Sequence, residues 1–351
     1  MDINKRCHEL LHRQKLLQQE RCYNMEQLLE HEVGIQSQIL SQSLLSIQCR
    51  VEVSQSFKYL LEEKRNIIRT WSLRGAMHLM RTVDAALLWN ALSIEWFTRW
   101  GTYLHQHVTE YQKQLISEAV LCSLSNRPKT REQLKNDLKH SLNVEHSIID
   151  YLLSAWGGIL KDLSYKRLVI QGELINNEVV FHLTTSWLNK QPDVFEVYDQ
   201  EEALGIILLR YLNAYGPAKI EDFAYWSGIT VNKAKKIVSH MSSELICIGD
   251  LYDNKNICPV ENTLAEEIVI LLPKFDSFLL GHKEKFYLDQ AHYKKVFSGA
   301  GNINAPVILN GRVLGTWSRK GKKISCNMFE AVDEHVQSEI NREVTRLQCD
   351  I

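Results

Sequence analysis

The stretch between residues 203 and 251 is the sequence feature that most restricts the fold. Apolar residues recur there at helical spacing in three segments, turn-forming residues separate the segments, and a strand-like run follows. In order, these are a helix over 203–214, a turn at Tyr215-Gly216-Pro217-Ala218, a helix over 220–226, a turn at Ser227-Gly228, a helix over 231–241 and a strand over 245–251. This element order is that of a winged helix-turn-helix module.

A similar order is predicted near the N-terminus. Leucines recur at helical spacing over 5–32, a second helix opens with Ser41 as its N-cap, and a third begins near Ser54. The stretch 66–80 is typical of two short strands that meet at Gly75, because apolar residues flank this glycine on both sides. Three helices followed by a hairpin predict another winged helix.

The same order recurs in the middle of the chain. Helical spacing covers 115–124, a capping box joins Thr130 to Gln133, and a helix over 144–156 ends at Gly157-Gly158. Alternating apolar residues then predict strands, at 159–163, 168–170 and 179–183. These segments predict a third winged helix.

The chain changes character from about residue 267. Asn310-Gly311 lies between two apolar runs and is a strong signal for a type I′ hairpin. Strands are expected at 268–272, 307–309 and 313–317, and an amphipathic helix at 328–347. We therefore predict a helix-rich α+β protein with three tandem winged-helix motifs and a C-terminal β-rich α/β module. The predicted segments are 1–83, 84–195, 196–266 and 267–351.

Composition limits the function. The 351 residues carry 41 Lys and Arg against 42 Asp and Glu, a formal net charge of −1. A purely electrostatic DNA binder is usually clearly basic, so DNA binding by this chain requires that its basic side chains gather on one face. The low content of glycine (16) and proline (6) favours helices with short connections.

Cysteine spacing and apolar runs indicate the compartment. None of the eight cysteines forms a C-x-x-C pair, so reduced thiols are favoured over a zinc or redox site. The N-terminus is charged and helical rather than a signal peptide, and the apolar run from Ala203 to Leu209 is too short to span a bilayer. We expect a cytoplasmic protein with no membrane association.

Four blocks of sequence carry a resemblance to a known family. They are GIQSQ at 34–38, RTWSLRGAMHL at 69–79, YLNAYGPA at 211–218 with DFAYWSG at 222–228, and LLPKFD at 271–276 with LLG at 279–281 and NGRVLGTW at 310–317. In this order, and over nearly the whole chain, the blocks resemble the AlkZ and YcaQ family of winged-helix DNA glycosylases. The resemblance implies three winged helices and a β-rich module arranged as a C-shaped clamp.

The resemblance also implies an activity and a site. The family hydrolyses the N-glycosidic bond of N7-alkylated purines, including crosslinked ones. Its functional motif is Gln, an aliphatic residue, then Gln or Asp. Gln36 and Gln38 match the Gln/Gln version, which resembles the AlkZ branch. Ser37 replaces the aliphatic residue, a departure that can alter the local packing.

Two glutamines suit this chemistry. Gln36 and Gln38 fall in the connection between two predicted helices, and in an extended stretch the side chains at i and i+2 point the same way. A glutamine is no general base, but its amide can hold a water. An N7-alkylpurine already carries positive charge and leaves without an acid, so the enzyme mainly positions water and stabilises an oxocarbenium-like sugar. We expect no cofactor and no metal.

Basic residues on the predicted hairpins are the candidates for DNA contact, because wings commonly meet phosphates and arginine suits that task. The candidates are Arg69, Arg74 and His78 on the first hairpin, Lys161, Lys166 and Arg167 on the second, and Arg319 and Lys320, with Lys322 and Lys323, after Trp317. A structural interpretation stands beside each: the arginines as salt-bridged scaffold, the histidine as a satisfied structural residue, and the basic runs as solvated faces.

Aromatic residues in the matched blocks are interpreted as core or inter-module packing rather than as base-stacking platforms. They are Trp71, Tyr215, Trp226, Phe275 and Trp317. Asp276 follows a predicted strand, and for this residue a cap or a salt bridge is favoured over a role as catalytic acid.

Three functions are compatible with these patterns. The first is a monofunctional, monomeric DNA glycosylase that acts on double-stranded DNA with alkylated purines and unhooks interstrand crosslinks. The second is a winged-helix regulator that binds DNA without chemistry. The third is a protein-interaction scaffold, which predicts no salt-dependent DNA binding. The near-neutral charge and the glutamine pair favour the glycosylase.

Overall fold

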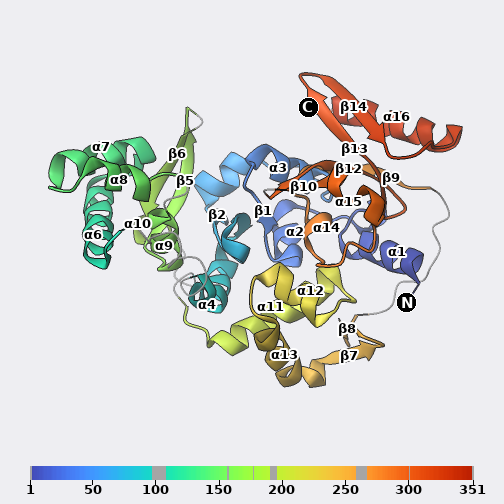
Figure 1. The fold of residues 1–351 in the computed structure, drawn as a ribbon, viewed down its shortest axis with the longest axis horizontal. Coiled ribbons are helices and arrows are strands. Elements are labelled where there is room, and N and C mark those ends of the chain that lie inside the picture. Colours follow the sequence, from blue (N-terminus) through green and yellow to red (C-terminus); the bar gives the residue numbers. More distant parts are fainter. Residues whose placement is uncertain are drawn as a thin grey trace. The chain divides into compact units, whose positions relative to one another are not determined.

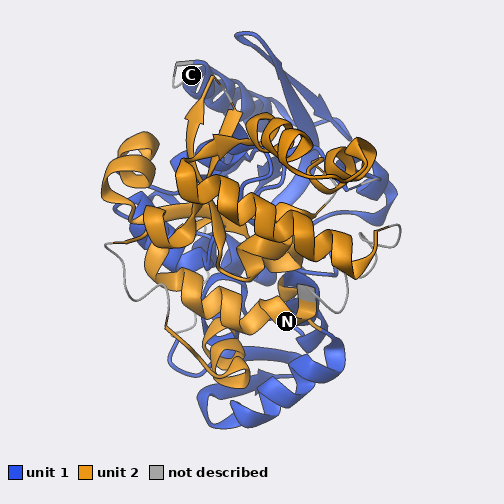
Figure 2. Ribbon diagram, turned by 90° about the vertical axis from the view of Figure 1, so that its left-hand side faces the viewer, with its two compact units in different colours: residues 1–54, 208–226, 230–351 blue, residues 55–207, 227–229 orange. Residues whose placement is uncertain are grey.

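Two compact units, blue and orange in Figure 2, make up the chain. The computed structural model describes residues 2–96, 108–155, 158–176, 178–189, 196–257, 267–299 and 301–349. Unit 1 contains residues 1–54, 208–226 and 230–351, and unit 2 contains residues 55–207 and 227–229. Both units mix helices with strands, which confirms the predicted α+β class. The boundaries of the four modules predicted from the sequence stay predictions.

Three helices open unit 1 in Figure 1: α1 (Ile3–Arg13), α2 (Met25–Glu32) and α3 (Leu40–Gln48). Asp2 caps α1 by accepting from the backbone N–H of Asn4, and Asn24 caps α2 by accepting from that of Gln27. Unpaired N–H groups at each helix start are thereby satisfied, which fixes where α1 and α2 begin.

Two helix boundaries predicted in this region are wrong. The continuous helical stretch over 5–32 is interrupted, because Lys15 adopts a left-handed φ of 56° and a 3-10 turn, η1 (Gln18–Glu20), follows. The N-cap of α3 is Ile39 rather than Ser41, and no side chain caps this helix.

The helices α11 (Gln200–Tyr215), α12 (Ile220–Ser227) and α13 (Val231–His240) follow one another as predicted. The single strand predicted over 245–251 is instead a hairpin of β7 (Leu245–Ile248) and β8 (Leu251–Asn254), because Gly249 turns the chain with a φ of 67°. Backbone hydrogen bonds of 2.8 and 3.0 Å join Ala218 to Tyr252, so the turn after α11 pairs with this hairpin.

A four-stranded antiparallel sheet forms the C-terminal part of unit 1, in the order β14-β13-β12-β9. Its strands are β9 (Val269–Leu271), β12 (Ala305–Leu309), β13 (Arg312–Lys320) and β14 (Lys323–Met328). Smaller elements accompany it: α14 (Ser277–Leu280), η8 (Gln290–His292), α15 (Tyr293–Val296), β10 (Phe297–Gly299), β11 (Asn302–Ile303) and α16 (Glu334–Cys349). The helix predicted over 328–347 therefore begins six residues late, because 323–328 is the last strand of this sheet.

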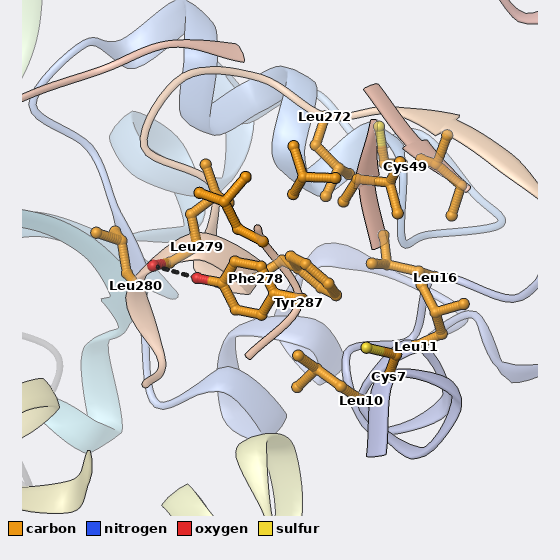
Figure 3. Packing of buried hydrophobic residues seen from close by; sticks show 14 of the residues in the cluster. Cys7, Leu10, Leu11, Leu16, Cys49, Leu272, Phe278, Leu279, Leu280 and Tyr287 are labelled. Carbon is orange, nitrogen blue, oxygen red and sulfur yellow. Dashed lines mark hydrogen bonds between the residues drawn. The ribbon is translucent and has the colours of Figure 1, made fainter. Parts of the chain in front are cut away.

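The two faces of this sheet are covered by different helices. Val269 and Leu271 pack with α16, whereas Ile270 and Leu272 pack with α1 and α14, as the alternation of a strand requires. Figure 3 shows the second cluster, in which the Tyr287 hydroxyl donates to the Leu279 carbonyl at 2.9 Å. The N-terminal helix α1 and the C-terminal sheet thus share one core.

The predicted hairpin at Asn310-Gly311 is confirmed. Asn310 and Gly311 have positive φ angles of 49° and 81°, the signature of a type I′ turn, and Leu309 pairs with Arg312. Only glycine fits at 311, since a Cβ there would lie 2.6 Å from the carbonyl oxygen of Cys7 in α1. The turn therefore seats the sheet against α1.

Unit 2 is built on strands in the order β3-β2-β5-β6-β4. They are β2 (Ile67–Trp71), β3 (Met77–Arg81), β4 (Lys129–Thr130), β5 (Val169–Ile175) and β6 (Glu178–Leu183). The hairpin predicted over 66–80 is confirmed as β2 and β3, with Ile67 opposite Arg81 and Trp71 opposite Met77. Trp71 stacks on Phe181 of β6, so this aromatic residue belongs to the core as predicted.

Helices complete unit 2: α4 (Ala85–Trp96), α6 (Glu110–Asn126), α7 (Arg131–Ser141), α8 (His146–Leu152), α9 (Ile159–Tyr165) and α10 (Thr184–Trp187). The capping box of Thr130 and Gln133 is confirmed at the start of α7. Two predictions are wrong: the segment 159–163 is helical rather than a strand, and the helix predicted over 144–156 stops at Leu152. The helix predicted near Ser54 is present from Phe57 and continues as the π-helical segment η2 (Tyr59–Lys64). Trp156 and Gly157 lie outside the described residues.

Two further expectations concern the surroundings of the protein. In the ranges that the structure describes, no helix is both long and apolar enough to cross a membrane. Six of the described cysteines are free thiols: Cys7, Cys22, Cys49, Cys122, Cys247 and Cys326.

Candidate active site

Gln36 and Gln38 lie in the short connection between α2 and α3. Val33 ends α2 with a left-handed φ of 60°, and Gly34 follows with a φ of 99°, so the chain turns sharply into the two-residue strand β1 (Ile35–Gln36). A β-branched residue rarely adopts this conformation, and such strain is concentrated at functional sites. The backbone before the motif is therefore held by its surroundings.

We call this connection the glutamine loop (residues 33–39), and exposure alternates within it from Ile35 to Gln38. Ile35 and Ser37 are 1% and 0% exposed, whereas Gln36 is half-buried and Gln38 is exposed. This alternation is that of an extended chain with one face inward. It favours a common outward side for both carboxamides, as the two-residue spacing predicted.

Ser37, which departs from the family motif, contacts a second buried serine. The Oγ atoms of Ser37 and Ser43 lie 3.1 Å apart, and Ser43 is 2% exposed. A buried hydroxyl without a partner costs about 1–3 kcal/mol, so this contact makes serine tolerable where the family has an aliphatic residue. Ser43 is a site that sequence reasoning missed, because a serine inside a helix gives no signal by itself.

A buried ionic network supports the glutamine loop. Arg50, two residues past the end of α3, donates from Nη2 to Asp276 Oδ1 at 2.6 Å and from Nη1 to Asp276 Oδ2 at 2.9 Å. Its Nε lies 3.4 Å from Oε1 of Glu32, the last residue of α2 before the loop. Arg50 and Glu32 are fully buried and Asp276 is 1% exposed. The network thus ties the start of the loop to the segment after β9.

Protonation in this network follows from burial and charge pairing. Burial alone lowers the pKa of Arg50, but the carboxylates of Asp276 and Glu32 outweigh this effect and raise the pKa. Burial raises the pKa of Glu32, and Arg50 only partly offsets that shift. The Tyr215 hydroxyl donates to Glu32 Oε2 at 2.9 Å, which extends the network to α11.

Asp276 has the structural role that the sequence favoured. Its Oδ1 caps α14 by accepting from the N–H of Phe278, and its carboxylate also accepts from Ser46 Oγ at 2.7 Å. With Arg50 bound as well, the carboxylate is occupied on all sides and faces no solvent. An acid that must protonate a leaving group needs access to it, and Asp276 has none.

The first predicted group of DNA-contacting residues lies on the β2–β3 hairpin of unit 2. Arg69 is half-buried, donates from Nη1 to Gln171 Oε1 at 3.3 Å, and has a pKa lowered by burial. Arg74 forms the turn with a left-handed φ of 55° and is also half-buried. His78 is 2% exposed, and burial, helped by the charge of Arg74, lowers the pKa of its imidazole to about 3.

The second group lies on a different element from the one predicted. Lys161 is in α9, and Lys166 and Arg167 form the turn between α9 and β5 rather than a hairpin. Lys166 is exposed, whereas burial lowers the pKa of both Lys161 and Arg167. Arg167 Nη1 donates to the backbone carbonyl of Glu196 at 3.1 Å.

The third group forms the tip of a hairpin. The strand that begins before Trp317 continues to Lys320, where Gly321 turns the chain with a φ of 61° and Lys320 pairs with Lys323. Four exposed cations gather at this tip: Arg319, Lys320, Lys322 and Lys323. A basic run that was predicted only as a sequence pattern therefore occupies one projecting turn.

The other aromatic residues of the matched blocks are packed inside unit 1. Tyr215 and Trp226 are both 2% exposed, and their ring centroids are 5.7 Å apart. Trp317 Nε1 donates to the Leu272 carbonyl at 2.7 Å, and Phe275 packs on the core drawn in Figure 3. Within the described ranges no three His, Cys, Asp or Glu side chains group into a potential metal site.

Comparisons with known proteins bear on the fold and the family of this chain. A family model described as DNA glycosylase AlkZ-like matches residues 29–348, a range that includes the glutamine loop. An interstrand DNA cross-link repair glycosylase of Streptomyces sahachiroi is 29% identical over 308 residues, which are 81% of this chain and 79% of that protein. The solved structure of Streptomyces sahachiroi DNA glycosylase AlkZ has the same fold, with a TM-score of 0.81 at 23% identity over 99% of this chain and 97% of that one. Because the family model spans most of its length, this chain belongs to the AlkZ-like family of DNA glycosylases.

Proposed function

We propose that this DNA glycosylase hydrolyses the N-glycosidic bond of N7-alkylated purines in double-stranded DNA and unhooks interstrand crosslinks. The observation that carries the proposal is the glutamine loop, in which buried residues alternate with the less buried Gln36 and Gln38. The name of the Streptomyces sahachiroi relative, an interstrand DNA cross-link repair glycosylase, points to the same class of substrate.

The reaction requires a positioned water and stabilisation of positive charge on the sugar, and it requires no acid. An alkyl group at N7 makes the purine cationic, so the bond from the anomeric carbon to the base breaks with both electrons moving to the purine. The sugar becomes oxocarbenium-like, and water adds to it and loses a proton to the solvent. The amide oxygens of Gln36 and Gln38 accept from this water and face the developing positive charge. Positioned polar groups of this kind contribute about 2–4 kcal/mol each.

Preorganisation explains why the loop rests on a buried network. Groups that stabilise a transition state act best when they need not reorganise during the reaction. Arg50 and Glu32 hold the loop where it leaves α2, and Ser43 contacts it at Ser37. A carboxamide on such a support keeps its direction when DNA binds.

DNA binding is proposed to use the helix-and-hairpin segments as winged helices. The exposed Arg319 and Lys320 at the β13–β14 tip and the exposed Lys166 are the strongest candidates for phosphate contact, with Arg74 at the β2–β3 turn. The half-buried positions of Arg69, Lys161 and Arg167 favour scaffold roles, and the inaccessibility of His78 leaves it outside the proposed surface. The C-shaped clamp and the monomeric state stay predictions.

A regulator that binds DNA without chemistry finds no support in these comparisons, because each match is to a DNA glycosylase. A glycosylase also has a role for the two carboxamides of the glutamine loop, whereas a regulator without chemistry has none.

The substrate class is tested with three duplexes that differ in one base. The first carries N7-methylguanine, the second a nitrogen-mustard crosslink between N7 positions, and the third uracil, a neutral base that leaves as an anion and so needs stabilisation that two glutamines facing the sugar do not supply. We expect abasic sites from the first two and none from the third. Release of uracil, or no release from either cationic lesion, contradicts the proposal.

A further inference from the structure

One polar side chain of the glutamine loop points inward. Ser37 is 0% exposed and lies between the two glutamines, where the family motif has an aliphatic residue. An aliphatic residue would hold the loop by packing alone. A buried hydroxyl holds it through a hydrogen bond with a preferred direction, provided that a partner is fixed in place.

Ser43 supplies this partner from the first turns of α3. Its Oγ lies 3.1 Å from Ser37 Oγ and 2.8 Å from the carbonyl oxygen of Leu40. A hydroxyl has one proton and two lone pairs. Ser43 Oγ is the donor toward both Ser37 Oγ and the Leu40 carbonyl oxygen, so its single proton is shared between the two acceptors and links the glutamine loop to the first turn of α3.

The helix that carries Ser43 is itself fastened on both sides of it. Gln42 Oε1 accepts from the backbone N–H of Lys274 at 3.0 Å, and Ser46 Oγ donates to Asp276 Oδ2 at 2.7 Å. Both bonds reach the segment between β9 and α14. Ser43 is therefore a fixed point, and a bond to it restricts the rotation of the loop around Ser37.

We propose that Ser37 and Ser43 are positioning residues whose mutual hydrogen bond aims Gln36 and Gln38 at the anomeric carbon. The inference rests on the proposed function of the two glutamines. Small displacements of catalytic groups cause large losses of rate, up to about 100-fold for roughly 1 Å. The bond should therefore affect the chemical step and leave DNA affinity unchanged.

Four variants test the pair. Ser37→Ala and Ser43→Ala each remove the hydrogen bond between the two serines. The double alanine variant removes the same single bond. Ser37→Val with Ser43→Ala replaces both polar groups by apolar ones and restores the aliphatic residue of the family motif. Ser41→Ala is the matched control, since Ser41 is an exposed serine of the same helix. Single-turnover release of N7-methylguanine and the Kd for the same duplex are measured for each.

The expected result is a loss of about 5- to 10-fold in the single-turnover rate for each single variant, with the Kd unchanged. The double alanine variant should be no slower than the slower single variant, because both changes break one bond. The valine–alanine pair should recover to within about threefold of wild type, since exchanging both partners for apolar groups is nearly neutral. Ser41→Ala should match wild type.

Hydrogen exchange of the free protein gives a second readout that needs no substrate. In Ser43→Ala, exchange should accelerate in residues 33–39 and stay at the wild-type rate in α3. Unchanged exchange in the loop, a wild-type rate in both single variants, or multiplied losses in the double variant overturn the inference. Faster exchange throughout α3 also overturns the inference, because Ser43 would then stabilise the helix as a whole rather than position the glutamine loop.

Failure of the proposed function has a different signature. If Gln36→Ala and Gln38→Ala release the base at the wild-type rate, the glutamines are not the reacting groups and this inference falls, although the chain is still a glycosylase; the proposed function fails only if the wild-type protein releases no cationic base. If those variants lose activity while the serine variants keep it, only the positioning role is wrong.

Discussion

The guanidinium of Arg50 and the carboxylate of Asp276 meet in a two-point contact of 2.6 and 2.9 Å, although 226 residues separate them in the sequence. Arg50 is fully buried and Asp276 is 1% exposed. The pair joins the segment after β9 to the end of α3. Through Glu32, which contacts Arg50, it also supports the loop that carries Gln36 and Gln38.

Breaking the buried pair should destabilise the protein strongly. Arg50→Ala or Asp276→Ala leaves one charge buried without its partner, a change that costs about 3–5 kcal/mol of unfolding free energy. Urea denaturation measures the loss. Arg342→Ala is the control, since Arg342 pairs with Glu339 on the surface with its side chain 72% exposed, and exposed pairs contribute little. Equal losses in the control and in the buried variants would show that burial is not the cause.

Protonation of His78 should weaken the fold in acid. Burial lowers the pKa of His78 from 6.5 to about 3, so the folded state holds the neutral imidazole. The contribution of neutral His78 to the free energy of unfolding is fully present above pH 6.5. It is lost as the pH falls from there toward 3. From about pH 7 to about pH 5 this one group removes about 2 kcal/mol of unfolding free energy.

The variant His78→Asn checks this effect, because its side-chain amide still donates but does not titrate. Its unfolding free energy should fall by about 2 kcal/mol less than that of wild type between those two pH values. An unchanged difference in His78→Asn contradicts the assignment.

The pH profile of base release should depend on the identity of residue 38. Neither Gln36 nor Gln38 titrates, so wild-type release of N7-methylguanine should be flat between about pH 5 and pH 8 once spontaneous release is subtracted. Gln38→Asp matches the Gln/Asp form of the family motif and should remain active. Its rate should fall in acid as the new carboxylate is protonated, near its ordinary pKa of about 4. A flat acid limb in this variant would exclude residue 38 from the reaction.

Salt dependence should identify the phosphate contacts at the β13–β14 tip. Arg319→Ala and Lys320→Ala should each lower the slope of log affinity against log salt by about 0.9 and weaken binding to every duplex sequence equally. Arg342→Ala removes an exposed cation from α16 in the same unit and should leave the slope unchanged. An unchanged slope in the tip variants would place the DNA elsewhere.

Local signals predicted part of the fold well. Asn310-Gly311 is a type I′ turn because both residues tolerate positive φ, and Thr130 caps α7 because Gln133 returns the hydrogen bond. These features depend on residues within four positions of each other, so the interactions that form them can be predicted from the local sequence. The three helices between 200 and 240 were predicted for the same reason.

Other features could not be predicted from local patterns. The segment 159–163 has apolar residues at 159, 160 and 163, which fits both a strand and one turn of helix, and its packing as α9 decides between them. The pairing of Ser37 with Ser43 and of Arg50 with Asp276 depends on how distant segments fold together. In the candidate site, a family motif in the sequence identifies the two glutamines, whereas the residues that support them become visible only in the folded structure.

The central claim is that Gln36 and Gln38 act in the chemical step and not in DNA binding. The most direct test compares the Gln36→Ala/Gln38→Ala variant with wild type and with Gln19→Ala, which alters an exposed glutamine of the same unit. Both the Kd and the single-turnover release are measured on one N7-methylguanine duplex. The account predicts an unchanged Kd and a loss of at least about 1,000-fold in release for the double variant alone. Release at the wild-type rate, or a loss explained by weaker DNA binding, contradicts it.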